Sequence, residues 1–262
     1  MIAALVAATI AALVLLLLVL RGEAERRLAA RQLEGTQKEL ERLQAAFARF
    51  APSRLVERII DSGVDITAER RPVTILFADV QGFTQLTEQL EPDVLMRLLG
   101  GYFSAMSEAI TSHHGHVAKF MGDGLMALFG DLDANPWQAR DAVEASLAMR
   151  ASLAAYNRTL SAEGLPAIGF GVGINHGVVV TGVVGHESLL QFDVHGDAVN
   201  VAARVEQLTR TLGVDILVTD AVKNLLDDQY LTREMPPTSV KGKSMPILTF
   251  AVEGKKETRG IP

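Results

Sequence analysis

The chain has 262 residues, of which 48% are hydrophobic, and a formal net charge of −6. This length is enough for one substantial domain and an appendage. The acidic balance gives no reason to expect a nucleic-acid partner, since nucleic-acid-binding modules normally carry a clustered basic face. The chain has no cysteine, which excludes disulfides, thiolate metal sites and cysteine nucleophiles.

The first residues form an apolar segment. Met1–Leu20 contains no charged side chain and is about long enough to cross a ~30 Å hydrocarbon core as a helix. Arg21 follows it, and nothing basic precedes it, which favours a cytoplasmic C-terminal side. We therefore expect a transmembrane helix over residues 1–21. A cleaved signal peptide is the rival interpretation, although it usually has a basic start and a shorter apolar core. The helix could also be the last membrane span of a longer gene product.

Residues 22–51 are rich in helix formers and contain no proline. Apolar positions three and four residues apart predict a short, parallel, dimeric coiled coil, with the seam at Leu33, Thr36, Leu40, Leu43, Phe47 and Phe50. A single amphipathic helix that lies on the following domain is the alternative, because Gly35 and the polar Thr36 weaken the seam. Pro52 ends the pattern, and residues 52–70 are expected to be a connecting segment.

The main domain is expected over residues 71–254, with a C-terminal tail at 255–262. Val73–Val80 is an apolar run of strand length. Pro92 suits the first turn of a helix that ends before Gly115, because the N–H that proline lacks has no partner there. Two short strands, 117–120 and 125–129, are predicted on either side of a glycine-flanked hairpin turn.

The second half of the domain alternates in the same way. A helix is predicted over 136–159, followed by strands at 168–175 and 178–184 joined through His176-Gly177. A further strand at 190–194 leads to a helix that ends near Arg210, and a last strand is expected at 247–252. This order predicts an α/β (α+β) fold, a ferredoxin-like βαββαβ sandwich with extra strands.

Two carboxylates are candidate metal ligands. Asp79 ends an otherwise apolar strand, and Asp123 lies at the tip of the predicted hairpin. An unpaired buried charge is very costly, and a hard cation such as Mg²⁺ or Mn²⁺ between two carboxylates is one way to compensate it. The alternative is that each aspartate caps a turn, since spacing alone does not bring the two together.

Other polar side chains are candidates for nucleotide contacts. Asn200 and Arg204 are four residues apart on a predicted helix, so they share a face that either orients a ribose and a phosphate or is simply solvated. Lys119 lies on an otherwise apolar strand, where a single lysine usually extends to solvent. Lys241 follows Pro236-Pro237 and either contacts a polyphosphate or is solvated. The cluster His113, His114 and His116 is interpreted as a loop before a strand rather than as a metal site.

Three segments together resemble the signature segments of class III adenylate and guanylate cyclases, in the order and spacing of that family. They are FADVQGFT at 77–84, KFMGDGLMALF at 119–129 and FDVHGDAVNVAAR at 192–204. VKGK at 240–243 resembles the family's C-terminal lysine segment. The resemblance covers roughly 71–254. It is nearest to membrane-anchored bacterial adenylate cyclases, which implies a single-pass protein of the inner (cytoplasmic) membrane with its catalytic domain in the cytoplasm.

The resemblance implies a role for each matching residue. Asp79 and Asp123 match the aspartates that bind two Mg²⁺ or Mn²⁺ ions in each active site, with help from the backbone carbonyl of Val80. Asn200 matches the residue that orients the ribose, and Arg204 matches the one that stabilises the pentavalent phosphorus.

Three further positions match substrate contacts. Lys119 and Asp193 match the pair that reads the purine ring, and Lys241 matches the lysine that contacts the β- and γ-phosphates. Lysine and aspartate suit adenine, whereas guanylate cyclases of the family typically carry Glu and Cys at these positions. His195 departs from the pattern, because related enzymes often have a bulky apolar or aromatic residue there.

The activity that the resemblance implies is adenylate cyclase, a phosphorus-oxygen lyase that converts ATP to 3′,5′-cyclic AMP and pyrophosphate. In the family, the metal aspartates and the Asn/Arg pair of one site come from different subunits, which implies a homodimer with shared sites. No nucleic-acid partner is expected. The alternatives are a guanylate cyclase, or a non-catalytic nucleotide-binding or dimerisation module of a membrane signalling protein.

Overall fold

The computed structural model describes residues 21, 34–40, 42, 68–186, 189–238 and 246–256. The chain divides into two units, 1–56 and 57–262. In the first unit the described residues are helical, and Lys38 donates to Glu34 one turn away across 2.7 Å. The predicted transmembrane helix and most of the predicted coiled-coil seam lie outside the described residues. Among the residues that are described, no helix is both long and apolar enough to span a bilayer.

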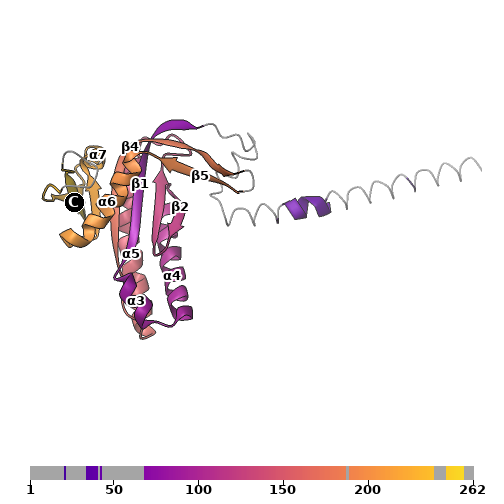
Figure 1. Ribbon diagram of the computed structural model, residues 1–262, viewed down its shortest axis with the longest axis horizontal. Coiled ribbons are helices and arrows are strands. Elements are labelled where there is room, and N and C mark those ends of the chain that lie inside the picture. Colours follow the sequence, from indigo (N-terminus) through magenta and orange to yellow (C-terminus); the bar gives the residue numbers. More distant parts are fainter. Residues whose placement is uncertain are drawn as a thin grey trace, which may run out of the picture. The chain divides into compact units, whose positions relative to one another are not determined.

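The second unit is built on a mixed sheet of eight described strands (Figure 1). The strands are β1 Glu69–Gln81, β2 His116–Met121, β3 Gly124–Phe129, β4 Gly169–His186, β5 Leu189–His195, β6 Ile216–Thr219, β7 Tyr230–Glu234 and β8 Thr249–Lys255. The helices between them are α3 Phe83–Gln89, α4 Pro92–Thr111, α5 Gln138–Ala162, α6 Asp197–Leu212 and α7 Asp220–Lys223.

The first four strands lie in the order β2-β3-β1-β4, and all pairs among them are antiparallel. With α4 between β1 and β2 and α5 between β3 and β4, this is the βαββαβ arrangement that the sequence predicts. The extra strands extend the same sheet. β6 pairs parallel to β4 and is followed by β8 and β7, while β5 pairs with β4.

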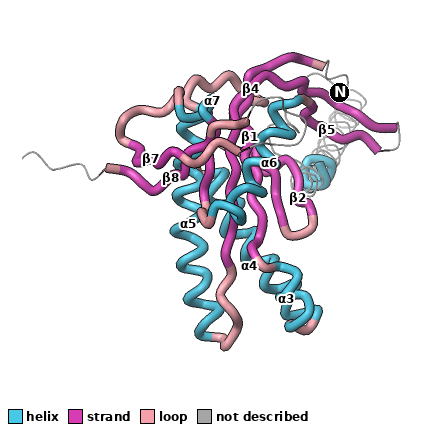
Figure 2. Tube along the Cα trace, turned by 60° about the vertical axis from the view of Figure 1, so that its left-hand side comes forward, coloured by secondary structure: helices cyan, strands magenta, loops and turns pink. Residues whose placement is uncertain are grey.

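The two faces of the sheet are covered by different helices. Alternate residues of β1 point to opposite faces, as in any strand. Leu76, Ala78 and Val80 pack in the core that α4 and α5 close, and these two helices lie side by side in both views (Figures 1 and 2). Val73 and Ile75 face the other way and pack in the cluster that includes Ala202 of α6.

The prediction of two strands joined through His176-Gly177 is wrong, because β4 runs unbroken through both residues. Gly177 pairs with Val73 of β1, and the Nδ1 atom of His176 lies 3.0 Å from the hydroxyl of Thr74. β1 is long enough to pair with β4 on both sides of this point. A Cβ atom at position 177 would lie 2.8 Å from the Cβ of Ala198 in α6. The glycine therefore allows close helix packing and does not form a turn.

Other differences from the predicted elements are local. The sequence gives no separate signal for α3, which starts directly after Gly82, a glycine with a positive φ of 75°. Pro92 is in the first turn of α4, as predicted. The helix predicted over 136–159 is observed as α5 at Gln138–Ala162, and the last strand is shifted from 247–252 to Thr249–Lys255.

Candidate active site

Asp79 lies between two glycines of the neighbouring strands. Its register partners are Gly124 on β3 and Gly171 on β4. A Cβ atom at position 124 would lie 3.0 Å from the Oδ1 atom of Asp79, and one at position 171 would lie 3.1 Å from the Oε1 atom of Glu206 in α6. The absence of side chains at these two positions therefore leaves room above the sheet for acidic groups.

The β2–β3 hairpin brings Asp123 to Asp79. The two carboxyl groups are close enough for a side-chain hydrogen bond when one of them is protonated. Burial raises the pKa of Asp79, and the negative charge of Asp123 raises it further. The structure therefore places together the two aspartates that the sequence singled out, although nothing in their spacing required it.

α6 adds two charged residues that the sequence analysis did not select. The guanidinium of Arg210 forms an ion pair with Asp79, and its NH2 group also lies 3.5 Å from the carbonyl oxygen of Val80. Glu206, one turn earlier, is only 7% exposed. Burial, followed by the charge of Asp79, raises the pKa of Glu206 to about 7. A signal was present, because Glu206 falls on the same helical stripe as the buried Val205 and Thr209.

The oxygens around Asp79 suit a hard divalent cation. The carboxylates of Asp79 and Asp123 lie close to the carbonyl oxygen of Val80. The positive guanidinium of Arg210 already contacts Asp79 and this carbonyl oxygen. Within the described ranges, no group of three or more His, Cys, Asp and Glu side chains is arranged to hold a metal. The remaining ligands of an ion here would be water and phosphate oxygens, which is the usual way in which Mg²⁺ is held in nucleotide sites.

A second pair of candidate residues also meets in space. Lys119 on β2 donates to the Oδ2 atom of Asp193 on β5 across 2.9 Å, so it does not extend freely to solvent. Burial alone would raise the pKa of Asp193, but the hydrogen bonds from Lys119 and from the Val194 N–H outweigh it and lower the pKa. The Nε2 atom of His195 lies 3.8 Å from the same carboxylate oxygen.

Asn200 and Arg204 lie on a different side of α6. With 3.6 residues per turn, they are rotated by roughly 120° about the helix axis from Glu206 and Arg210. Asn200 is exposed and Arg204 is half-buried. Neither side chain has a hydrogen bond or an ion pair with any residue in the described part of the chain. The structure therefore does not direct Arg204 at the carboxylates of its own chain. Lys241 lies outside the described residues.

The histidine cluster has structural partners. The Nε2 atom of His116 lies 3.4 Å from the Oδ2 atom of Asp131, which is 1% exposed. The Nδ1 atom of His113 lies 2.7 Å from the carbonyl oxygen of Ala109. His116 therefore has an acidic partner, Asp131, that lies 15 positions further along the chain.

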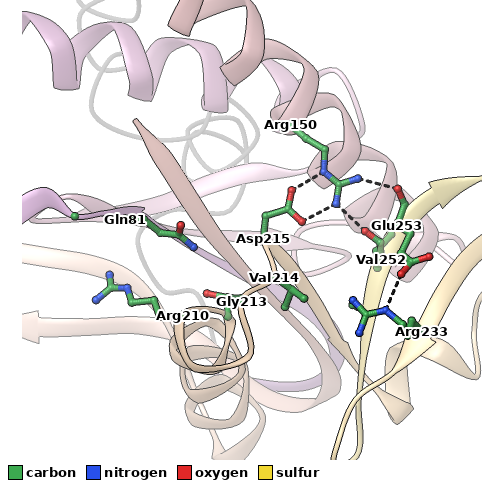
Figure 3. Close-up of a pocket in the computed structure, with 12 residues that line it drawn as sticks. Gln81, Arg150, Arg210, Gly213, Val214, Asp215, Arg233, Val252 and Glu253 are labelled. Carbon is green, nitrogen blue, oxygen red and sulfur yellow. Dashed lines mark hydrogen bonds and ion pairs between the residues drawn. The ribbon is translucent and has the colours of Figure 1, made fainter. Parts of the chain in front are cut away.

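A hollow of about 630 Å³ opens beside Arg210. Figure 3 shows Gln81 and Arg210 on one side of it, with two ion pairs, Arg150–Asp215 and Arg233–Glu253, on the other. The guanidinium of Arg150 also donates to the backbone carbonyls of Val252 and Glu253 across 2.7 and 3.1 Å. Arg150 therefore ties α5 to β8 and to the residue just before β6.

Residues 67–254 match the family described as "Adenylate and Guanylate cyclase catalytic domain". The chain belongs to the class III adenylate and guanylate cyclase family. The resemblance seen in the sequence is therefore confirmed. Members of this family generally use divalent metal ions, and their catalytic domains bind nucleoside triphosphates and function as dimers.

Named relatives include cyclases of both kinds. An adenylate cyclase of Anabaena cylindrica is 36% identical over 219 residues, which are 79% of this chain and 43% of that protein. The chain thus spans less than half of this relative's length. The adenylyl cyclase CyaB from P. aeruginosa has a similar fold, with a TM-score of 0.69, 29% identity and coverage of 73% of this chain and 98% of that one. The guanylyl cyclase Cya2 has a TM-score of 0.67, 32% identity and coverage of 75% and 98%. Two relatives that are 33–36% identical over 79% of this chain are adenylate cyclases, so the comparisons favour adenylate over guanylate cyclase.

Proposed function

We propose that this protein is an adenylate cyclase, which converts ATP to 3′,5′-cyclic AMP and pyrophosphate. The observation that carries this proposal is the Lys119–Asp193 pair, at 2.9 Å, in a chain of the cyclase family. An ammonium group can donate to N1 of adenine, and a carboxylate can accept from the exocyclic amine. Guanine presents a carbonyl and a protonated N1 at this edge, so the same pair opposes GTP.

Asp79, Asp123 and the carbonyl of Val80 are proposed to hold Mg²⁺ or Mn²⁺, with two ions per active site. Such ions would neutralise the triphosphate and lower the pKa of the ribose 3′-hydroxyl. The support for this role is the meeting of the two carboxylates and the raised pKa of Asp79, which a bound cation would lower again.

Asn200 and Arg204 are proposed to act on the nucleotide of a partner chain. Asn200 would orient the ribose, Arg204 would offset the charge that develops at the α-phosphorus, and Lys241 would contact the β- and γ-phosphates. The rotation of Asn200 and Arg204 away from Asp79, and their lack of partners among the described residues, support a site shared between two copies. No protein nucleophile is needed, because the 3′-hydroxyl attacks within the same molecule.

A complementation experiment tests the shared site. Asp79→Ala and Arg204→Ala should each be inactive alone, since each removes one half of both sites in a homodimer. A mixture should regain activity, because a mixed dimer contains one intact site. The control mixes two Asp79→Ala preparations that carry different tags, which also shows whether subunits exchange. Exchange without recovery would contradict shared sites.

Two other functions make different predictions. A guanylate cyclase should turn over GTP faster than ATP, and measurement of both rates with Mn²⁺ decides between them. A non-catalytic nucleotide-binding or dimerisation module of a membrane signalling protein should bind ATP without forming cyclic AMP. The presence of Asp79, Asp123 and Arg204 together favours turnover, since each of the three is proposed to be needed for it.

We also propose that residues 1–21 anchor the protein in the inner membrane, with the catalytic domain in the cytoplasm, and that residues 22–51 form a dimeric coiled coil. The support is the uncharged run Met1–Leu20 and the heptad spacing that follows it. Deletion of residues 1–50 should release the protein from membranes and make its specific activity fall on dilution. Activity that stays independent of concentration after the deletion would contradict the coiled-coil role.

A further inference from the structure

Arg210 occupies the position of a cation at the carboxylate site. Its guanidinium pairs with Asp79 and lies 3.5 Å from the carbonyl oxygen of Val80. These are two of the three groups to which we assign metal binding. A positive charge on Arg210 and a divalent ion at Asp79 would repel each other at this range. The two cations therefore compete for the same oxygens.

The side chain of Arg210 lies at the surface of α6. Although Asp79 is only 26% exposed, the side chain of Arg210 is 51% exposed, so the guanidinium reaches the carboxylate from the solvent side. It also borders the hollow of about 630 Å³, where Figure 3 shows it on the same side as Gln81, with Gly213 nearby.

The buried Glu206 adds a third acidic side chain beside Asp79 and Asp123. When no metal ion is bound, these three groups require another positive charge nearby. Glu206 is one turn from Arg210 on α6, and its Oε1 atom is buried without a hydrogen-bond partner in the described part of the chain. Asp79, Asp123 and Glu206 are close enough for the charge of each aspartate to act on Glu206. Within the described part of the chain, Arg210 is the cation that acts on both Asp79 and Glu206. Its charge offsets the repulsion within this acidic group.

We propose that Arg210 is a tethered counter-ion of the metal site, which leaves Asp79 and the Val80 carbonyl when a divalent ion binds. Arg210 thereby lowers the affinity of the nucleotide-free protein for that ion. The proposal rests on the assignment of Asp79 and Asp123 as metal ligands. The negative charge of a triphosphate would attract the guanidinium once it has left Asp79. A metal ion that arrives bound to a triphosphate therefore binds more tightly than the metal ion alone.

Mn²⁺ binding to the full-length chain in detergent, without nucleotide, tests this proposal. The electron paramagnetic resonance signal of free Mn²⁺ reports the dissociation constant and does not depend on turnover. Arg210→Gln should bind Mn²⁺ about fivefold more tightly than the wild type, which corresponds to the ~1 kcal/mol of a half-exposed ion pair. Arg210→Lys keeps the charge and should remain close to the wild type. Arg158→Gln is the matched control, because Arg158 is exposed on α5 and, among the residues that the structure describes, bonds only to a carbonyl of its own helix.

Asp79→Asn separates failure of this inference from failure of the metal assignment. If Asp79→Asn weakens Mn²⁺ binding and Arg210→Gln does not tighten it, Arg210 is not a competitor and the inference is overturned, while the metal site stands. If Asp79→Asn leaves Mn²⁺ binding unchanged, the metal assignment fails and the inference fails with it. Circular dichroism of each variant verifies that it is folded.

Discussion

Lys119 donates a hydrogen bond to Asp193 across 2.9 Å, although 74 positions separate the two residues. They lie on β2 and β5, which are not neighbours in the sheet, since β2 pairs with β3 and β5 pairs with β4. β4 continues beyond its pairing with β1, which ends at Thr181, and β5 pairs with this extension as far as His186. An ammonium and a carboxylate held together in this way form a polar edge that can distinguish one purine from another.

Lys119→Glu should replace the hydrogen-bond donor of this pair by an acceptor. The ratio of kcat/KM for ATP to that for GTP should fall at least about tenfold, because the donor to adenine N1 is lost and a second carboxylate lies beside Asp193. Steady-state rates with both nucleotides measure this ratio. Lys256→Glu is the control for net charge, since Lys256 is exposed beyond the last strand. An unchanged ratio would mean that Lys119 does not contact the purine.

Glu206 should make the metal-free protein less stable at high pH. The pKa of Glu206 is raised from 4.5 to about 7 in the folded state, so the folded protein holds this proton more tightly than the unfolded chain. The resulting stabilisation is present below the unfolded pKa and is lost as the pH rises through about 7. Glu206→Gln removes this dependence. Between about pH 5 and about pH 8, the free energy of unfolding of the wild type should therefore fall by roughly 1–2 kcal/mol relative to the variant.

Urea unfolding in the presence of a chelator measures the Glu206 effect at each pH. Glu108→Gln is a matched control, because Glu108 is exposed on α4. Its difference from the wild type should stay constant over the same range. A Glu206→Gln difference that is also constant would show that Glu206 titrates normally.

Two adjacent glycines of α4 should respond in opposite ways to alanine. A Cβ atom at Gly100 has nothing within 4 Å, so Gly100→Ala should raise the free energy of unfolding by roughly 0.5–1 kcal/mol through helix propensity. A Cβ atom at Gly101 would lie 2.2 Å from the hydroxyl oxygen of Tyr156, which donates to the carbonyl of Leu98. Gly101→Ala should therefore cost about 1–3 kcal/mol. Thermal unfolding of both variants measures the two effects, and equal shifts would contradict this packing of α4 on α5.

Arg150 should stabilise the end of the domain near β8. It pairs with both carboxylate oxygens of Asp215 and donates to the carbonyls of Val252 and Glu253. Arg150→Met keeps the apolar stem but loses all of these bonds, so it should lower the free energy of unfolding by roughly 1–3 kcal/mol. Arg158→Met, on the exposed side of the same helix, should change it by less than about 0.5 kcal/mol. Chemical denaturation of the two variants makes the comparison.

Most of the helices and strands, and the family, could be predicted from local patterns in the sequence. The apolar run Val73–Val80, the proline that opens α4 and the glycine-flanked hairpin around Asp123 are local patterns, and local patterns specify helices, strands and turns. Three ordered motifs then indicated the cyclase family and its site residues. The turn predicted at His176-Gly177 is wrong. A glycine that lets a helix pack closely against a strand has the same local sequence signal as a glycine that forms a turn.

Which side chains meet depends on the packing of strands and helices that are far apart in the sequence. Asp79 reaches Asp123 because β1 and β3 are neighbours, and the space above Asp79 exists because Gly124 and Gly171 lie on either side of it. Glu206 and Arg210 enter this space because α6 packs across the glycines of β4. Periodicity along the chain specifies which face of an element is buried, but it does not specify what covers that face. That choice depends on long-range packing and on the compensation of buried charge.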